Sequence, residues 1–282
     1  AYAYRRKATQ GGMSMQAQQA RLPYLGAYIK TYIPFNLSSG GWSRGVIPQL
    51  SISAGNDVYG FYNTDKKFIG QNYMSRLSMS LRAYTMLRTP GSCVYPKWGI
   101  GAELGWSMRP SMTDVFTSNA HAFVYAYVPG ILPEHGIRLS GVFAGSPSGA
   151  IFAQETVNTA PRGFTGAAAI LGAYPSRNKF TFDYAMPFAS IEWSGLSPVA
   201  YVRNLELDLH GDYSFFSTAA SAGNLFSVGA DFCVKLGNIL WLPFDTKLGV
   251  SYNYNGGSAF EKVVERTGDG HHSVGVVFSI AM

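Results

Sequence analysis

The residues with the clearest potential for chemistry in this sequence are one arginine and the carboxylates that follow it. Arg162 stands between a proline and a glycine in the segment TAPRGFTG, and Asp183, Asp208 and Asp212 come later in the chain. A guanidinium can bind two carboxylates at once through bidentate, charge-assisted hydrogen bonds. The spacing therefore allows an ion-paired clamp, and it equally allows an ordinary exposed loop arginine.

Covalent catalysis has little support in the sequence. His210 lies between Asp208 and Asp212 and has the residue types of an acid–base site, but a hydrogen-bonding role is the simpler interpretation. The segment GSPSG at 145–149 imitates a nucleophile elbow without the strand, turn and helix that such an elbow needs. We expect no catalytic residue, no metal site and no cofactor. Cys93 and Cys233 leave a disulfide open.

The elements that must position these residues are strands, because apolar and small or polar residues alternate along much of the chain. In the C-terminal segment SVGVVFSIAM, the large apolar residues fall on one face, and serine, glycine and alanine dominate the other. A soluble sandwich would show lysine, glutamate and threonine on its second face. Glycine, serine and isolated charges there fit the interior of a barrel better.

Composition points the same way. Of the 282 residues, 13% are charged and 15% are aromatic, and no apolar run is long enough for a membrane helix. These values suit a transmembrane β-barrel, with a soluble β-sandwich or a propeller as the alternatives. The net charge is +6, but the basic residues are scattered, so we expect no nucleic-acid partner.

The pattern predicts an all-β fold, a transmembrane antiparallel β-barrel with about twelve visible strands of the length that a tilted membrane strand needs. The longer connections are expected at 61–74, 108–118 and 146–177, and no amphipathic helix of useful length is expected. The predicted strands start near residues 1, 25, 46, 75, 97, 119, 136, 178, 199, 224, 245 and 271.

Strand alternation also gives each acid a direction. In NKFTFDYAMPF the large apolar residues share one face, so Asp183 points inward, and by the same count Glu206, Asp208 and Asp212 point inward from the next strand. Arg162 could then hold the connection 146–177 inside the lumen. Gly163 would allow a sharp turn, and Phe164 would pack against the wall.

These features together resemble the BamA-like superfamily of outer-membrane β-barrels, which includes assembly barrels and two-partner-secretion transporters. The resemblance rests on the Arg162-Gly163-Phe164 tip, the inward acids Asp183 and Asp212, and five strands after the loop. It implies that the tip locks onto those two acids, with Glu206 and Asp208 as secondary lumen acids. It covers residues 119–282 well and the rest by strand pattern only.

The last strand carries a second likeness. Ser273, Gly275, Phe278 and Ile280 resemble the C-terminal signal by which outer-membrane barrels are recognised for insertion, although the chain ends in Met282 and not in an aromatic residue. PGILPEHGIRLSG at 129–141 is also similar to surface-antigen barrels fused to TolB-like propellers in Bacteroidota-like proteins. The resemblance implies a barrel of about sixteen strands, of which about twelve are visible here. We therefore expect residues 1–282 to be a barrel that lacks N-terminal strands and a periplasmic domain, and the alternative is a genuine twelve-strand relative.

The resemblance implies a non-enzymatic protein of the Gram-negative outer membrane that inserts or translocates polypeptides. Its partners would be outer-membrane lipids and lipopolysaccharide, client polypeptides, and other outer-membrane or periplasmic subunits. The alternative is a non-catalytic accessory or structural barrel within a larger complex. A diffusion porin or a barrel lipase is a third interpretation, and the concentration of acids on one wall disfavours the porin.

Overall fold

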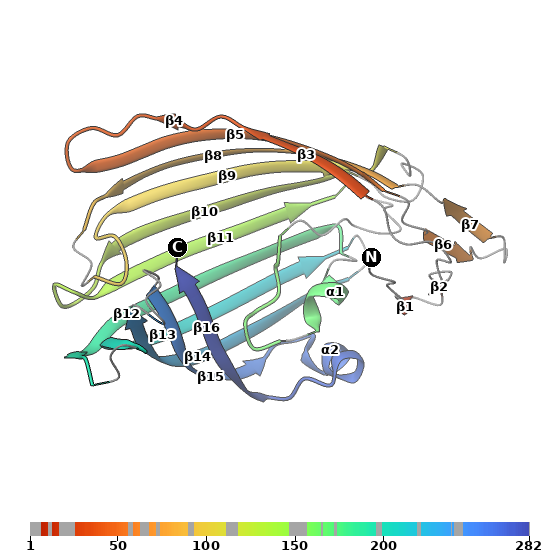
Figure 1. The fold of residues 1–282 in the computed structure, drawn as a ribbon. Coiled ribbons are helices and arrows are strands. Elements are labelled where there is room, and N and C mark those ends of the chain that lie inside the picture. Colours follow the sequence, from red (N-terminus) through yellow and green to blue (C-terminus); the bar gives the residue numbers. More distant parts are fainter. Residues whose placement is uncertain are drawn as a thin grey trace.

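The computed structural model describes most of the chain as antiparallel β-structure (Figure 1). Statements about structure below concern the residues that it describes. These are 7–10, 13–16, 26–55, 59–62, 68–71, 74–89, 93–110, 118–146, 157–164, 166–171, 174–195, 199–218, 221–237, 239 and 245–281.

The larger of two sheets has twelve strands, and all of its pairings are antiparallel. Its strands are β3 (Gly26–Tyr32), β4 (Phe35–Asn36), β5 (Trp42–Gly55), β8 (Met74–Leu87), β9 (Gly99–Met108), β10 (Asn119–Pro129), β11 (Gly136–Gly145), β12 (Ser176–Trp193), β13 (Tyr201–Ser217), β14 (Ala222–Gly237), β15 (Asp245–Gly256) and β16 (His272–Ala281). The order from edge to edge is β16, β15 and so on down to β8, then β5 and β3, with β4 paired to β5 beside this path. The all-β, antiparallel prediction is confirmed, and the strand starts predicted from residue 25 onward agree to within a few residues.

A smaller sheet contains β1 (Lys7–Gln10), β2 (Met13–Gln16), β6 (Tyr59–Tyr62) and β7 (Phe68–Gln71). Residues 1–6, where the first strand was predicted to start, lie outside the described residues, and β1 does not join the larger sheet. Two of the four strands, β6 and β7, fall largely within the segment 61–74 that was predicted as a plain connection.

The larger sheet curls strongly, so that β3 and β16 lie on opposite margins of an incomplete cylinder (Figure 1). Within the described residues, β16 pairs only with β15, and β3 pairs only with β5. The described part of the sheet is therefore open, and closure into a complete barrel stays a prediction.

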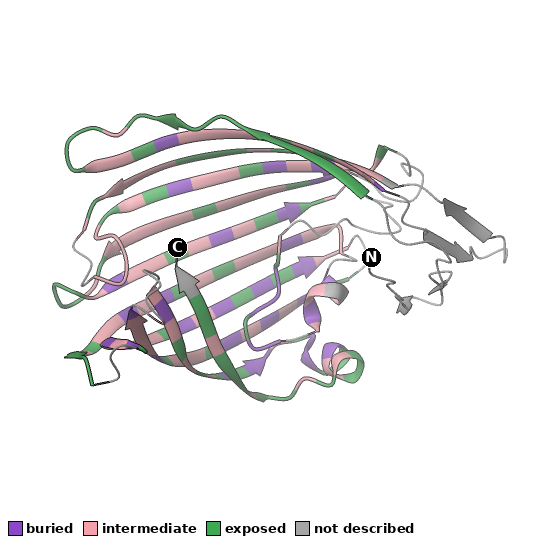
Figure 2. Ribbon diagram, in the orientation of Figure 1, coloured by how far each residue is buried: buried purple, intermediate pink, exposed green. Residues whose placement is uncertain are grey.

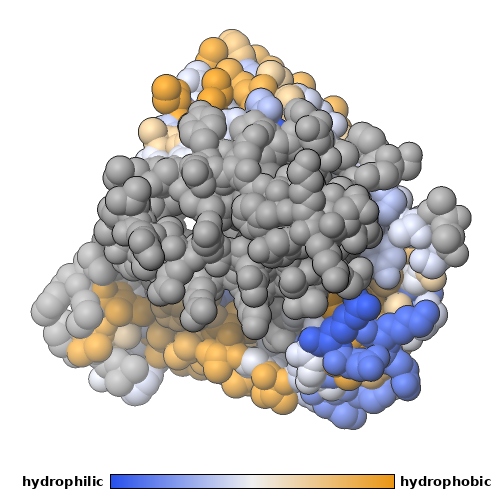
Figure 3. Space-filling view, turned by 90° about the vertical axis from the view of Figure 1, so that its right-hand side faces the viewer, coloured by the Kyte–Doolittle hydropathy of each residue, from blue (hydrophilic) through white to orange (hydrophobic). Residues whose placement is uncertain are grey.

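The two faces of the curled sheet differ in chemistry, as the alternation predicts. We call the concave face, which carries Asp183 and Asp212, the inner face. The convex face is apolar, and many of its large side chains are exposed, among them Ile100, Phe182 and Val250. Seen from the end with the longer connections, apolar residues gather along the upper and lower outside of the molecule (Figure 3). A convex apolar face is what a barrel wall in lipid requires.

The connections at the two ends of the sheet differ in length. At one end short turns join β10 to β11 through 130–135 and β12 to β13 through 194–200. At the other end 146–175 separates β11 from β12 and 257–271 separates β15 from β16, while only 218–221 separates β13 from β14. Bacterial outer-membrane barrels show the same asymmetry, with short periplasmic turns and longer extracellular loops.

Two short helices lie in these longer connections, α1 (Ala167–Leu171) and α2 (Phe260–Thr267). The prediction that no amphipathic helix of useful length occurs was wrong for α2, which buries Phe260 and Val263 and turns Glu261 and Arg266 to the outside. Gly268 ends it in the left-handed conformation, and its N–H donates to the Val264 carbonyl at 2.8 Å. Neither helix has the length and hydropathy to cross a membrane.

Candidate functional site: the Arg162 loop on the inner wall

The segment 157–164 folds against the inner face of β12 and β13, and Arg162 makes its principal contacts. The Arg162 backbone N–H donates to Asp212 Oδ2 at 2.8 Å, and its Nε donates to the same oxygen at 3.1 Å. Its Nη2 donates to Asp212 Oδ1 at 3.1 Å and also to Asp183 Oδ1. One residue from the loop therefore binds carboxylates on two adjacent strands.

The register of the two strands brings the acids together. Asp183 pairs with His210 and Thr181 pairs with Asp212, so the two carboxylates lie on a diagonal of one face. Both side chains are buried, with 0% of Asp183 and 2% of Asp212 exposed. Charged carboxylates are almost never buried to this extent unless they are paired, so their geometry depends on the cations around them.

Two further cations from the wall complete the pairing. Lys179 on β12 lies with its Nζ 3.2 Å from Asp212 Oδ2 and also donates to the Ala160 carbonyl at 2.9 Å. Arg138 on β11 donates from Nε to Asp183 Oδ2 at 2.7 Å. The wall therefore contributes Lys179 and Arg138, and the loop contributes Arg162.

Burial alone would lower the pKa of the Arg162 guanidinium, but its hydrogen bonds to Asp212 and the charges of Asp212 and Asp183 outweigh this effect and raise the pKa. Arg162 is consequently cationic at any pH that the protein meets. The guanidinium therefore keeps its charge, and any pH dependence of the attraction between the loop and the wall comes from the carboxylates.

The tip of the loop sits tightly against β14 and β15. The Gly163 carbonyl accepts a hydrogen bond from Asn255 Nδ2 at 2.9 Å, and the same amide nitrogen donates to the Gly270 carbonyl at 3.0 Å. A Cβ on Gly163 would lie 1.8 Å from Asn255 Oδ1 and 2.8 Å from Ser227 Oγ. We expected Gly163 to permit a sharp turn. Its φ lies outside the left-handed range, so the reason for glycine here is this close approach.

Phe164 was expected to pack against the barrel wall, and in the structure it packs against residues of both the wall and the two helices. It belongs to an apolar cluster formed by the loop, α1, the wall residues Phe216 and Leu225, and α2. Phe260 of α2 lies edge-on to Phe164 with ring centroids 6.1 Å apart, and His271 stacks on Phe260 at 4.0 Å. These contacts connect the loop tip to the residue just before β16.

The remaining predicted residues lie on the same inner face or on β16, but Arg162 does not bind them. Glu206 pairs with Lys247, and Asp208 accepts a hydrogen bond from Tyr95 at 3.3 Å. Their neighbour His210 has its Nε2 3.2 Å from Asp231 Oδ1. The proposed insertion signal (Ser273, Gly275, Phe278 and Ile280) lies on β16, the strand at one open margin of the sheet.

Sequence reasoning missed Lys179, Arg138, Ser214 and Asn255. Ser214 donates to the Thr159 carbonyl at 2.5 Å and so holds the segment just before the tip on β13. Lys179 and Ser214 share strand parity with the acids Asp183 and Asp212 on their own strands, so alternation could have placed them on the inner face. Asn255 becomes a candidate only when the register sets it opposite Ser227.

The polar atoms around the loop hold the segment 157–164 in place. Burial is concentrated on the inner face near the loop and helices, as Figure 2 shows. In comparisons with known proteins, no family model, no curated protein and no solved structure matches this chain.

Proposed function

We propose that this protein is a BamA-like barrel of a bacterial outer membrane that inserts or translocates polypeptides. The observation that carries the proposal is the Arg162 loop on the inner wall, bound to Asp183 on β12 and Asp212 on β13. A barrel that moves at one margin needs the rest of its wall held rigid.

The outer membrane as location is supported by the convex apolar face and by the unequal connection lengths. Lipids and lipopolysaccharide would then contact side chains such as Phe182 and Val250. In this orientation the Arg162 loop and α2 belong to the extracellular side, and the short turns belong to the periplasmic side.

The proposed mechanism uses strand pairing and no covalent chemistry. Within the described residues β16 has a partner on one side only, so its other edge offers unpaired N–H and C=O groups. An extended client segment could add to this edge by β-augmentation. Loop contacts with β12, β13 and β15 hold the adjoining wall in one shape while the margin exchanges partners.

The ion pairs of the inner-face acids weaken the porin interpretation. Asp183 and Asp212 are already bound by Arg162, Arg138 and Lys179, so they do not form a bare ladder that faces a channel. The loop, α1 and α2 also fill part of the interior at one end.

The test is complementation in the native host with the gene under a regulated promoter. Arg162→Ala should give a folded, membrane-inserted protein that fails to support growth or lowers the level of other outer-membrane barrels. Arg82→Ala is the matched control, because Arg82 also pairs with an inner-face acid, Glu103 at 2.6 Å, without involving the loop. Full activity of Arg162→Ala, with the loop still in place, would contradict the proposal and favour the accessory-barrel alternative.

A further inference from the structure

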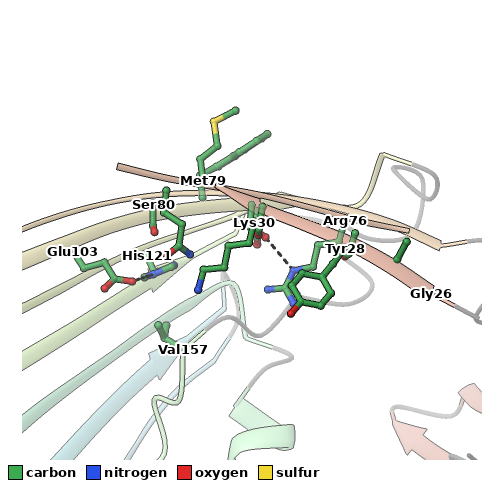
Figure 4. A pocket seen from close by; sticks show the side chains of 16 residues that line it. Gly26, Tyr28, Lys30, Arg76, Met79, Ser80, Glu103, His121 and Val157 are labelled. Carbon is green, nitrogen blue, oxygen red and sulfur yellow. Dashed lines mark hydrogen bonds and ion pairs between the residues drawn. The ribbon is translucent and has the colours of Figure 1, made fainter. Parts of the chain in front are cut away.

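We call the ion pairs of Arg162 with Asp183 and Asp212 the Arg162 clamp. On the wall opposite this clamp, an open cavity of about 580 Å³ lies on the inner face of β3, β5, β8, β9 and β10 (Figure 4). Its lining is rich in hydroxyl groups and carries Lys30 and Arg76. Val157, at the start of the described part of the Arg162 loop, lies at its border. The contacts of the Arg162 clamp do not explain why hydroxyl groups and two cationic side chains line this cavity.

The strand register places the hydroxyl groups in one row. Lys30 pairs with Ser51, Ser51 with Ser78, and Ser78 with Ser107, so the four residues cross β3, β5, β8 and β9 in succession. Neighbouring strands are about 4.8 Å apart, so successive side chains in the row are close enough to bind one small ligand together.

A second row lies one step along the strands and brings in the other cation. Tyr28 pairs with Ser53, and Ser53 pairs with Arg76. In Figure 4 the Lys30 and Arg76 side chains extend into the same space, and the Tyr28 ring lies next to Arg76. The cavity is therefore bordered by two cationic side chains with hydroxyl groups between them.

The positive charge of these side chains is not cancelled within the described residues. Arg76 Nε donates to Ser78 Oγ at 3.2 Å, and no ion pair to a described residue involves Arg76 or Lys30. Glu103 is the one acidic residue in the lining, and it is already bound by Arg82 at 2.6 Å.

Ser107 stands at the β9 end of the first row and is almost completely buried. It is 1% exposed, it lines the cavity, and its Oγ has no hydrogen-bond partner among the described residues. Buried hydroxyl groups in proteins are nearly always hydrogen-bonded, and an exception calls for an explanation such as an unseen water, ion or ligand.

We propose that this cavity binds an oxyanion, that is, a phosphate or carboxylate group carried by a small polar molecule. Arg76 offers a planar pair of donors that matches either group, Lys30 adds a point charge, and the serine row donates from the side. The site is separate from the Arg162 clamp and does not depend on the proposed function.

The test is titration calorimetry on the full chain folded in an uncharged detergent, at low ionic strength and neutral pH. Pyrophosphate, inorganic phosphate and citrate are the three probes. We expect saturable binding at one site, and the ranking of phosphates against citrate tells which oxyanion the site prefers. Arg76→Gln and Lys30→Gln should each weaken binding by about tenfold because each removes a charge-assisted contact, and Ser107→Ala should weaken it by a smaller factor.

Arg203→Gln is the matched control. It removes one positive charge from β13, where Arg203 pairs with Asp245 at 2.9 Å, away from the cavity lining. Circular dichroism and the heat-dependent gel shift of a folded barrel verify that each variant is folded. The proposal is overturned if none of the probes saturates, or if Arg203→Gln weakens binding as much as Arg76→Gln and Lys30→Gln do.

Discussion

The curled sheet has two walls with the same alternation of apolar and polar residues, but one wall is covered by the Arg162 loop and the other borders an open cavity. On β12 to β15 the inner face buries charged and amide side chains such as Asp183, Asp212 and Asn255, and the Arg162 loop covers them. On β5, β8 and β9 the inner face carries serine and glycine with separate cations, and it borders an open cavity. Alternation determines which residues face inward on both walls. Ion pairing with the loop determines which wall is closed.

The comparison implies that polar substitutions on the covered wall cost far more than those on the open wall. On the covered wall, each polar group satisfies another buried group. On the open wall, water can replace a lost partner.

The largest effect is expected from Asp212→Asn. Asp212 accepts three hydrogen bonds from Arg162 and pairs with Lys179, so its loss leaves Lys179 without a carboxylate partner and Arg162 with Asp183 alone. The free energy of unfolding should fall by about 3–5 kcal/mol, the usual result of breaking a buried ion pair on one side. Urea unfolding of the folded barrel in lipid vesicles measures it, and a loss below about 1 kcal/mol, as for an exposed ion pair, would contradict this account.

A smaller loss is expected from Gly163→Ala. The new Cβ would lie 1.8 Å from Asn255 Oδ1, so either the tip or Asn255 must move. Overpacking of this kind costs about 1–3 kcal/mol in the free energy of unfolding. Gly211→Ala on β13 is the control, because a Cβ there meets nothing within 4 Å. Equal effects of the two substitutions would show that the tip is not held close to Asn255.

Asn255→Ala tests the same contact from the other side. Two donated hydrogen bonds, to the Gly163 and Gly270 carbonyls, are lost, and we expect a cost of about 1–2 kcal/mol. In combination with Gly163→Ala the two costs should be less than additive, because removing Oδ1 relieves the steric conflict. Strict additivity of the unfolding free energies would count against direct contact.

The smallest effect is expected from Arg82→Ala on the open wall. Arg82 pairs with Glu103 at 2.6 Å, but 55% of its side chain is exposed. Exposed ion pairs contribute about 0–1 kcal/mol, so the unfolding midpoint in urea should hardly change. A loss comparable to that of Asp212→Asn would remove the distinction between the two walls.

The sequence alone predicted the inward direction of the two acids and the position of the loop that binds them. Alternation around Phe182 and Leu207 was enough to turn Asp183 and Asp212 inward, and both lie on the inner face. The position of Arg162 between proline and glycine identified the loop. Alternation and the residues next to Arg162 are both local in the sequence, so they can be read without knowing which strands pair.

Other features depended on register and on contacts between distant segments. Asn255 meets Gly163 only because β15 pairs with β14 in a particular register, and no local pattern encodes that contact. Helix α2 covers 260–267, too short a window for a clear helical period. Its amphipathic character matters because Phe260 packs against the cluster around Phe164.

The most direct test of the central claim is amide hydrogen exchange of the segment 159–164, followed by mass spectrometry, in the wild-type protein and in Arg162→Ala. The Arg162 N–H is bound to Asp212 Oδ2, and the Phe164 N–H is bound to the Pro161 carbonyl at 3.2 Å. Exchange in this segment should accelerate by tenfold or more in the variant, about 1.4 kcal/mol of lost protection, while β9 and β10 stay unchanged. Unchanged exchange in 159–164 would mean that Arg162 does not hold the loop on the wall.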